Sequence, residues 1–213
     1  MIVRDIMTWN VVTVSSDTPM MEAKKIMETH NIRRLPVVDK GKLVGVITKD
    51  GINRPGPSAA TSLSVWEINY LLAKMTVKDI MHKDVITISP DMSVEAAVAL
   101  AQSKHIGALL VAESNRLIGI ATTDDFFYKI LNPILGIGKS GVRLTISSCA
   151  NAKCIADIMN CVAKHNVKIV AVHNEPPVEG KEADLYLHLD TDNADKVIKD
   201  LKDKGYTVNV RER

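Results

Sequence analysis

The stretch that decides the fold is Val3-Arg4-Asp5-Ile6-Met7, because it returns as Val77-Lys78-Asp79-Ile80-Met81. The spacing of 74 residues continues beyond these two openings without a gap. The same amino acid stands at 11 and 85, 13 and 87, 15 and 89, 17 and 91, 23 and 97, 32 and 106, 35 and 109, 37 and 111, 43 and 117, 45 and 119, 48 and 122, and 50 and 124. Such self-similarity indicates that the first two-thirds of the chain is two copies of one structural unit.

Each copy predicts the element order β-α-β-β-α. In the first copy, Val11–Val14 is a β-branched run typical of a strand. Thr18 and Pro19 predict a helix start, with the hydroxyl as cap and the proline in the first turn. Two further strands, at 35–38 and 43–47, surround a turn at Lys40-Gly41, and a short helix follows. One such unit has too little buried face to be stable alone, so we expect the two copies to pack about a pseudo-twofold axis.

The segment between the copies predicts a loop and a helix. Asn53–Ser58 has the composition of a loop. Ser64-Val65-Trp66-Glu67 has the pattern of a capping box. Apolar residues then recur at helical spacing, namely Trp66, Tyr70, Leu71 and Met75, and we interpret this helix as a connector that packs on the repeats.

The last third of the chain predicts a second fold. Gly136–Gly141 is a glycine-rich hinge, without the spacing or the following helix that a phosphate loop needs. Strands are predicted at 142–146, 167–172, 185–189 and 208–210. One helix is predicted from Ile155 to His165-Asn166, and a second over 194–201 is closed by Gly205. The order βαββαβ is the ferredoxin-like arrangement. We therefore expect an α+β (α/β) protein with the boundaries 1–52, 53–76, 77–132, 133–141 and 142–213.

Composition excludes several classes of protein. The formal net charge is +2, which gives no electrostatic footprint for nucleic acid or an anionic membrane surface. No apolar run reaches the roughly 18 residues of a membrane span, and the N-terminus lacks a signal peptide. We therefore expect a cytoplasmic protein. The three cysteines form no C-x-x-C pair, which favours free thiols.

The end of the second hairpin carries the candidate site chemistry. A hydroxyl at Thr122 and the N–H groups of a helix that begins near Asp125 suit a phosphate group. The carboxylate of Asp125 can accept two hydrogen bonds from a ribose diol. Threonine and aspartate at this place are also common helix caps, so the local pattern leaves both interpretations open.

The repeats resemble the cystathionine-β-synthase (CBS) domain family. The resemblance rests on the two openings, the Val-Thr-Val and Ile-Thr-Ile strands, Arg34–Asp39, and the two Gly-x-x-Thr hairpin ends, and it covers residues 1 to about 130. It implies a tandem pair with two clefts that bind adenosine ligands such as AMP, ADP, ATP or S-adenosylmethionine. Carried over, one cleft has Thr122 facing phosphate and Asp125 holding ribose, while Thr87, Gly107 and Ala108 line the adenine side.

The first repeat departs from this pattern. Its candidate site residues are Thr13, Arg33, Arg34, Thr48 and Asp50, with the two arginines available to a polyphosphate. Gly51 occupies the usual aspartate position, and Asp50 would point about 100° away on a helix. The resemblance therefore implies a first site without a ribose contact.

Two finer resemblances complete the prediction. The segment 57–72 resembles the inter-repeat linker of AcuB-type (acetoin utilisation) CBS proteins. Residues 142–213 resemble an ACT domain, a small-ligand-sensing module that often controls amino-acid metabolism. The resemblance implies an amino-acid ligand at the first strand–helix loop, where Lys153 stands near the place of the usual glycine and Asn151 is the remaining polar candidate.

These observations predict a regulatory protein that senses an adenosine-containing ligand and relays binding to the ACT-like domain. The alternative is a ligand-free dimerisation or scaffold protein. The sequence has no nucleophile–base pair or metal cluster at useful spacing, so we expect neither an enzyme, a resident cofactor nor a metal site. The resemblance implies a homodimer, with no nucleic-acid or membrane partner, and leaves the regulated target protein open.

Overall fold

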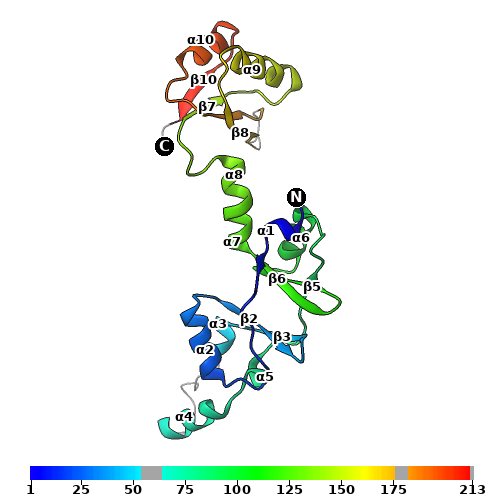
Figure 1. The fold of residues 1–213 in the computed structure, drawn as a ribbon. Coiled ribbons are helices and arrows are strands. Elements are labelled where there is room, and N and C mark those ends of the chain that lie inside the picture. Colours follow the sequence, from blue (N-terminus) through cyan, green and yellow to red (C-terminus); the bar gives the residue numbers. More distant parts are fainter. Residues whose placement is uncertain (54–63, 176–181, 212–213) are drawn as a thin grey trace. The chain divides into compact units, whose positions relative to one another are not determined.

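The computed structural model describes residues 1–53, 64–175 and 182–211, and the chain divides into two compact units, Met1–Phe126 (unit 1) and Phe127–Arg213 (unit 2). Unit 1 contains, in chain order (Figure 1), α1 (Val3–Ile6), β1 (Thr8–Trp9), α2 (Met20–Thr29), β2 (Arg34–Asp39), β3 (Lys42–Thr48), α3 (Lys49–Asn53), α4 (Val65–Lys74), α5 (Val77–Ile80), β4 (Thr87–Ile88), α6 (Val94–Ser103), β5 (Ala108–Glu113), β6 (Arg116–Thr122) and α7 (Thr123–Phe126). The mixed α/β class expected from the sequence is confirmed.

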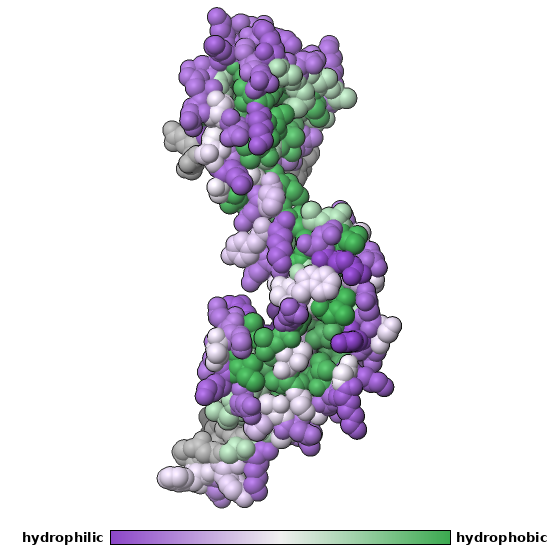
Figure 2. Space-filling view, viewed as in Figure 1, coloured by the Kyte–Doolittle hydropathy of each residue, from purple (hydrophilic) through white to green (hydrophobic). Residues whose placement is uncertain are grey.

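The two predicted hairpins are the best-formed parts of unit 1. Strands β2 and β3 pair antiparallel, as do β5 and β6, and each pair shifts register once, at Val37/Val38 and at Val111/Ala112. The first turn uses Lys40 and Gly41, both with positive φ, as the sequence predicts. Aliphatic side chains of both hairpins are buried, and on the face shown in Figure 2 hydrophobic atoms gather over the region of the β2–β3 hairpin.

The opening segment of each repeat packs into the core of the other repeat. Val3 and Met7, which open the first repeat, are buried in the core of the second with Leu109, Val111 and Ala121. Val77 is buried in the core of the first repeat, where Met81 packs at its edge. Glycines in the opposite hairpins make room for the two methionines. A methyl group added to Gly119 would lie 2.5 Å from Met7 Sδ, and one added to Gly45 would lie 2.7 Å from Met81 Sδ.

Main-chain hydrogen bonds fix this exchange at both ends. The N–H of Val3 donates to the carbonyl of Met92 at 2.9 Å, and the N–H of Val77 donates to the carbonyl of Thr18 at 2.9 Å. Strand β1 then pairs antiparallel with β6 of the second repeat. Each repeat therefore completes its core with the opening segment of the other, so the two repeats pack together.

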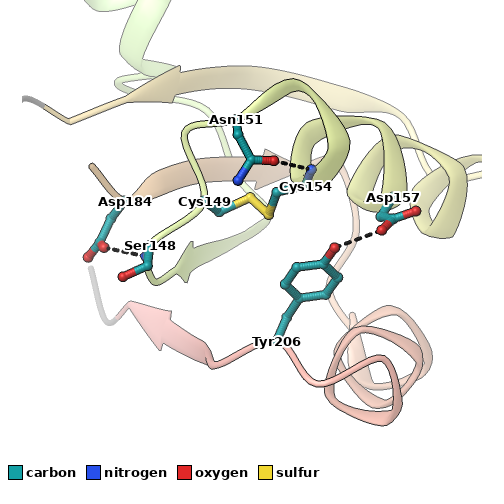
Figure 3. Close-up of a disulfide and its surroundings, with 7 residues drawn as sticks. All are labelled: Ser148, Cys149, Asn151, Cys154, Asp157, Asp184 and Tyr206. Carbon is teal, nitrogen blue, oxygen red and sulfur yellow. Dashed lines mark hydrogen bonds between the residues drawn. A yellow bond between two sulfur atoms is a disulfide. The ribbon is translucent and has the colours of Figure 1, made fainter. Parts of the chain in front are cut away.

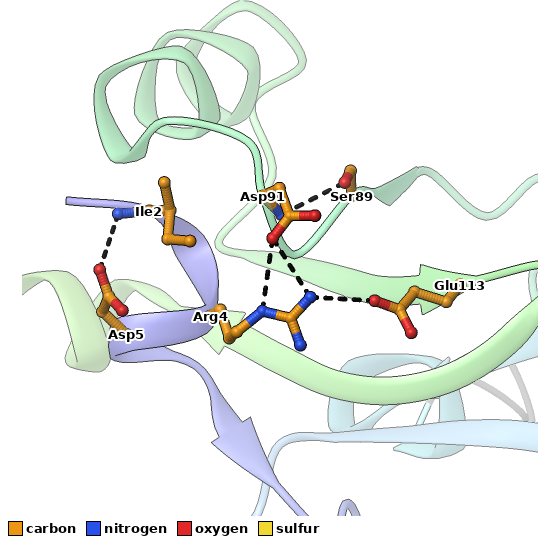
Figure 4. Close-up of polar contacts among 6 residues, drawn as sticks. All are labelled: Ile2, Arg4, Asp5, Ser89, Asp91 and Glu113. Atoms are coloured by element: carbon orange, nitrogen blue, oxygen red, sulfur yellow. Dashed lines mark hydrogen bonds and ion pairs between the residues drawn. The ribbon is translucent and has the colours of Figure 1, made fainter.

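A surface ion-pair cluster accompanies each exchanged segment. Arg4 Nη2 lies 3.1 Å from an Asp91 carboxylate oxygen and 3.0 Å from one of Glu113 (Figure 4). At the equivalent place, Lys78 Nζ lies 3.5 Å from Asp17. These groups are largely exposed, so they orient the segments more than they stabilise them.

Two local predictions in unit 1 are wrong. Val11–Val14 is not a strand, because only Val14 makes a bridge, to Val37. Pro19 rather than Thr18 is the cap residue of α2, and no side-chain cap bond forms there.

The helix predicted as a connector is confirmed in part. The Ser64–Glu67 capping box forms, and Met75 packs against the core of the first repeat, whereas Trp66 and Tyr70 are 86% and 60% exposed. Residues 54–63, which include most of the predicted loop and the start of the predicted linker, lie outside the described residues.

Unit 2 has the predicted ferredoxin-like order. It contains η1 (Phe127–Leu131), α8 (Asn132–Leu135), β7 (Val142–Ile146), α9 (Ala152–Lys164), β8 (Ile169–Asn174), β9 (Leu185–Leu189), α10 (Asp195–Asp203) and β10 (Val208–Arg211). The strand order is β10-β7-β9-β8, with α9 and α10 packed on one face over an aliphatic core. Strand β8 begins two residues later than predicted.

The segment predicted as a hinge is fixed to the sheet of unit 2. Gly136 ends α8 in the left-handed conformation, with φ 62°. Arg143 Nη2 donates to the Gly136 carbonyl at 2.9 Å, and His188 Nε2 lies 2.8 Å from the Ser140 carbonyl oxygen. The domain boundaries and the hinge at 133–141 stay predictions, but residues 136–140 themselves are held in place within unit 2.

The expectation of three free thiols is wrong for two of them. Cys149 and Cys154 form a disulfide, and Cys161 is a buried free cysteine. The sequence could not predict this pair, because two cysteines five residues apart meet only if the loop between β7 and α9 turns sharply. Residues 150–153 make that turn and place Cys154 in the first turn of α9, with the two Cα atoms 5.6 Å apart.

A carboxylate between α9 and α10 gives unit 2 an expected sensitivity to acid. Asp200 Oδ2 accepts hydrogen bonds from Lys164 Nζ at 2.7 Å and His165 Nε2 at 2.9 Å. The bond from Lys164, and then the one from His165, lowers the pKa of Asp200. A lowered pKa means that the stabilisation is fully present above the unfolded value of about 3.9 and is lost as the pH falls through the folded value.

We therefore expect unit 2 to lose stability below about pH 4, and to lose less of it in Asp200→Asn. Denaturant midpoints measured from pH 6 to pH 2.5 test this, with Asp203→Asn on the same helix as a control for the change of charge. Parallel acid profiles of the wild type and Asp200→Asn would contradict the assignment.

Candidate functional site

The repeat-two site is the set Thr87, Gly107, Ala108, Thr122 and Asp125. Thr122 is the last residue of β6, and α7 follows with no intervening loop, so Asp125 stands in its first turn. Ala108 begins β5 and is the cross-strand partner of Thr122. The end of one hairpin therefore brings Gly107, Ala108, Thr122 and Asp125 together.

Asp125 is the buried polar residue of this site, with 8% of its surface exposed. Its Oδ2 accepts hydrogen bonds from the N–H of Thr122 at 2.8 Å and from the Thr122 hydroxyl at 2.7 Å. Its Oδ1 accepts the hydroxyl of Thr8 at 3.3 Å. The role of Asp125 as a helix cap thus explains the two short bonds to Oδ2. The bond to Oδ1 is longer and comes from the Thr8 hydroxyl, which can rotate.

Thr87 lies apart from the carboxylate. It is exposed on β4, and its cross-strand partner is Leu110, two residues along β5 from Ala108. Thr123 instead closes the site, because its Oγ1 donates to the Gly107 carbonyl at 3.1 Å.

Besides Thr123, the structure adds two residues to this site that the sequence did not indicate there. Thr8 reaches it because β1 pairs with β6, where Thr8 lies opposite Ile120 and its hydroxyl donates to Asp125 Oδ1. Arg34 reaches it from the first repeat, since a methyl group added to Gly107 would lie 2.9 Å from Arg34 Nη2. In the sequence, Thr8 directly follows the repeated opening, but this position does not indicate which residues it contacts.

The residues proposed for the first repeat form a weaker set. The N–H of Gly51 donates to Thr48 Oγ1 at 3.0 Å, so the hydroxyl caps α3 where the second repeat also has a carboxylate. Asp50, Thr13 and Arg33 are exposed. Arg34 pairs with Thr48 along the hairpin, but its guanidinium group lies beside Gly107 of the second repeat. No acidic side chain takes the place of Asp125 in the first repeat, because Gly51 stands there.

Outside the two repeat sites, the described residues offer a groove in unit 2 but no metal-binding cluster. Residues 1–53, 64–175 and 182–211 contain no group of three His, Cys, Asp or Glu side chains that could hold a metal ion. No helix within these ranges is long and apolar enough to cross a membrane. An open groove of about 400 Å³ lies between α9 and α10 of unit 2, lined by Asn160, Cys161, Lys164, Asp200, Asp203 and Lys204.

The loop before α9 in unit 2 is engaged in its own hydrogen bonds. Asn151 Oδ1 accepts from the N–H of Cys154 at 2.9 Å and so caps α9. Asp184 Oδ1 accepts from the N–H of Ser148 at 3.0 Å. Asn151, the polar candidate for an amino-acid ligand, is therefore used as a helix cap.

Comparison with known proteins matches both repeats. The sequence pattern of the CBS domain matches residues 3–54 and 77–132, just over half of the chain. Inosine-5'-monophosphate dehydrogenase of Methanocaldococcus jannaschii is 31% identical over 174 residues, which are 76% of this chain and 32% of the dehydrogenase. The chain therefore spans about a third of the length of that relative.

Shorter proteins match over more of their length. The CBS domain-containing protein YhcV of Bacillus subtilis is 29% identical over 123 residues, 58% of this chain and 81% of that protein. The crystal structure of a Vibrio cholerae protein named for acetoin utilization (AcuB) superposes with a TM-score of 0.53 and 27% identity, covering 62% of this chain and 91% of that one.

Proposed function

Because the chain belongs to the family of CBS-domain proteins, we propose that it is a regulatory protein that binds an adenosine-containing ligand at the repeat-two site. AMP, ADP, ATP and S-adenosylmethionine are the proposed ligands, and the cytoplasm is the proposed location. The observation that carries the proposal is the Asp125 carboxylate, buried at a strand–helix junction with Oδ2 fixed by Thr122.

The geometry supports different roles for the two carboxylate oxygens of Asp125. Oδ2 is held by two short hydrogen bonds and so orients the carboxylate. Oδ1 receives the Thr8 hydroxyl at 3.3 Å, a long bond for two oxygen atoms. A ribose hydroxyl that donates to Oδ1 would replace Thr8, while Thr122 and the N–H groups at the start of α7 face phosphate.

Replacement of the Thr8 hydroxyl by a ribose hydroxyl supplies a route for the proposed relay. Thr8 belongs to β1, so its release alters the contact of the exchanged opening segment with β6. The chain leaves the site through α7 and continues into η1 at the start of unit 2. A ligand shifts such an equilibrium only by its differential affinity for the two states, and we propose that the ACT-like domain at 142–213 receives the change.

The alternative is a ligand-free scaffold, in which the protein works as a homodimer and Asp125 is only a helix cap. The network around Oδ2 favours this reading as well, because it satisfies Thr122 without a ligand. Neither proposal assigns an enzymatic activity, a cofactor or a metal to the chain.

Thermal unfolding with a ligand panel separates the two functions. ATP, ADP, AMP, S-adenosylmethionine and NADH are added in turn to the full-length protein. We expect at least one adenosine ligand to raise the midpoint, since a ligand at a hundredfold excess over its Kd stabilises the native state by about 2.7 kcal/mol. An unchanged midpoint with every member of the panel would favour the scaffold.

Restoring the missing carboxylate should create a second site. In Gly51→Asp the new side chain would cap Thr48 as Asp125 caps Thr122, and its Cβ would lie 3.2 Å from Thr48 Oγ1, a hydroxyl that can rotate. We expect the binding stoichiometry measured by calorimetry to rise from one ligand per chain to two.

Asp50→Asn is the matched control for this experiment, because it changes the charge of the neighbouring exposed residue and should leave the stoichiometry at one. If Gly51→Asp folds normally and still binds one ligand, the missing carboxylate is not the reason that the first repeat binds no ligand.

A further inference from the structure

We propose that Cys149 and Cys154 are a reversible redox pair, which a small-molecule disulfide of the glutathione type oxidises and the corresponding thiol reduces. The pair lies in unit 2, so the proposal does not depend on the adenosine ligand of unit 1. It gives the loop before α9 a chemistry that the amino-acid-sensing hypothesis did not.

The loop geometry holds the two cysteines together. They are bonded through sulfur with their Cα atoms 5.6 Å apart, within the usual range for a disulfide. Figure 3 shows the bond between the loop and the first turn of α9. Two hydrogen bonds from main-chain N–H groups fix the other side of the loop, one from Cys149 to the Ala183 carbonyl and one from Ser148 to the side-chain Oδ1 of Asp184, both at 3.0 Å.

The bond lies directly beneath an exposed stretch of chain. Cys149 is fully buried and Cys154 is 4% exposed, whereas Ser148 and the four residues between the cysteines, 150–153, are exposed. A local opening of this loop therefore uncovers the sulfur atoms without unfolding the sheet or α10. Local opening of a surface loop requires much less free energy than global unfolding.

The two thiols of the reduced pair differ in reactivity. Cys154 is the third residue of the 13-residue α9, and the N-terminal end of a helix stabilises a thiolate. Cys149 precedes the helix. Cys154 is therefore the attacking thiol, and Cys149 is the thiol that resolves the mixed disulfide.

The exchange balances without any further reactant. The Cys154 thiolate attacks one sulfur of the oxidant, forms a mixed disulfide and releases one thiolate, which takes up the proton lost by Cys154. The Cys149 thiolate then attacks Cys154 Sγ, forms the internal disulfide and releases the second thiol. Two cysteine thiols have lost two electrons and two protons, and the oxidant has gained them.

Cys161 provides an internal reference for this chemistry. It lies seven residues after Cys154 in the middle of α9 and is a free cysteine with 3% of its surface exposed. It has neither a bonded partner nor a place at the helix start. The proposal therefore assigns redox exchange to two of the three cysteines of the chain and none to the third.

The test equilibrates the full-length protein in buffers of reduced and oxidised glutathione, quenches with acid, and alkylates in denaturant before intact-mass and peptide analysis. We expect one alkylated cysteine, Cys161, in the most oxidising buffer and three in the most reducing buffer, with a single transition between them. Cys161→Ser should show the same transition, with no alkylated cysteine in the most oxidising buffer and two in the most reducing buffer. Cys149→Ser and Cys154→Ser should each lose the internal disulfide.

Three results would overturn the proposal. Three alkylated cysteines in every buffer would mean that no internal bond forms. A disulfide that stays closed in fully reduced glutathione would be a permanent structural bond. A bond to Cys161 or between two chains would assign the chemistry elsewhere.

Hydrogen exchange reports where the reduced pair changes the protein. We expect reduction to speed exchange at residues 147–154 and to leave the β2–β3 hairpin of unit 1 unchanged. The same comparison in Cys149→Ser, with and without reductant, should show no difference, whereas a reductant effect that persists in this variant would contradict the assignment to the pair.

Discussion

Asp125→Ala is expected to abolish the rise in thermal midpoint that an adenosine ligand gives the wild type. The variant loses Oδ1, the atom that we propose accepts a ribose hydroxyl, and Oδ2, which holds Thr122. At a hundredfold excess over Kd the lost ligand stabilisation is about 2.7 kcal/mol. For a chain of this size that corresponds to about 2–4 °C of midpoint for each kcal/mol.

The unliganded stability of this variant will also fall. Loss of a helix cap costs about 0.5–2 kcal/mol, so the measured quantity must be the ligand-induced shift rather than the midpoint itself. Asp124→Ala, at the exposed neighbouring residue, should retain the full shift.

Thr8→Val sharpens the comparison, because it removes the hydroxyl that competes for Oδ1 while Asp125 remains. We expect its ligand shift to equal or exceed that of the wild type. A shift that survives Asp125→Ala would move the ligand to another part of unit 1.

Met7→Ala is expected to destabilise the second repeat by about 2–5 kcal/mol, although Met7 belongs to the opening of the first repeat. Met7 is 3% exposed in the core that contains Leu109 and Val111, and its sulfur fills the space above Gly119. Truncation leaves a cavity that the hairpin β5–β6 cannot close without moving. The free energy of unfolding from denaturant titration measures the loss.

Met21→Ala is the matched control, since Met21 is 54% exposed on α2 and its truncation should change stability little. Hydrogen exchange locates the effect. Protection should fall first in β5 and β6 for Met7→Ala, and in β2 and β3 for Met81→Ala. If Met7→Ala instead loosened β2 and β3, the exchange of opening segments would be wrong.

The hairpins and the ferredoxin-like order could be predicted because short-range patterns determine them. Alternating aliphatic residues, the turn at Lys40-Gly41 and the glycine after α10 each act within a few residues of sequence. The Thr122–Asp125 pair was visible for the same reason, since a cap is a local motif. The family match confirms the repeat itself.

The remaining features depend on partners that are distant along the chain. Nothing in Val3–Met7 says that it packs against the second repeat, because either core offers the same aliphatic surface. Thr8 and Arg34 were therefore missed at the repeat-two site, and Arg34 was assigned to the first repeat instead. The disulfide was missed because it depends on how residues 150–153 lead into α9, which no pattern in the sequence determines.

The exchanged opening segments also determine the order in which the two cores can form during synthesis on the ribosome. Val77 must leave the exit tunnel before the first repeat can complete its core, and Val3 must wait until Leu109 and Ala121 have emerged. Long sequence separation between contacting residues slows folding. The core of the nascent first repeat therefore stays incomplete until Val77 emerges, and the apolar side chains of Val3 and Met7 stay exposed until the second hairpin is made. This is the interval in which a chaperone has the most to shield.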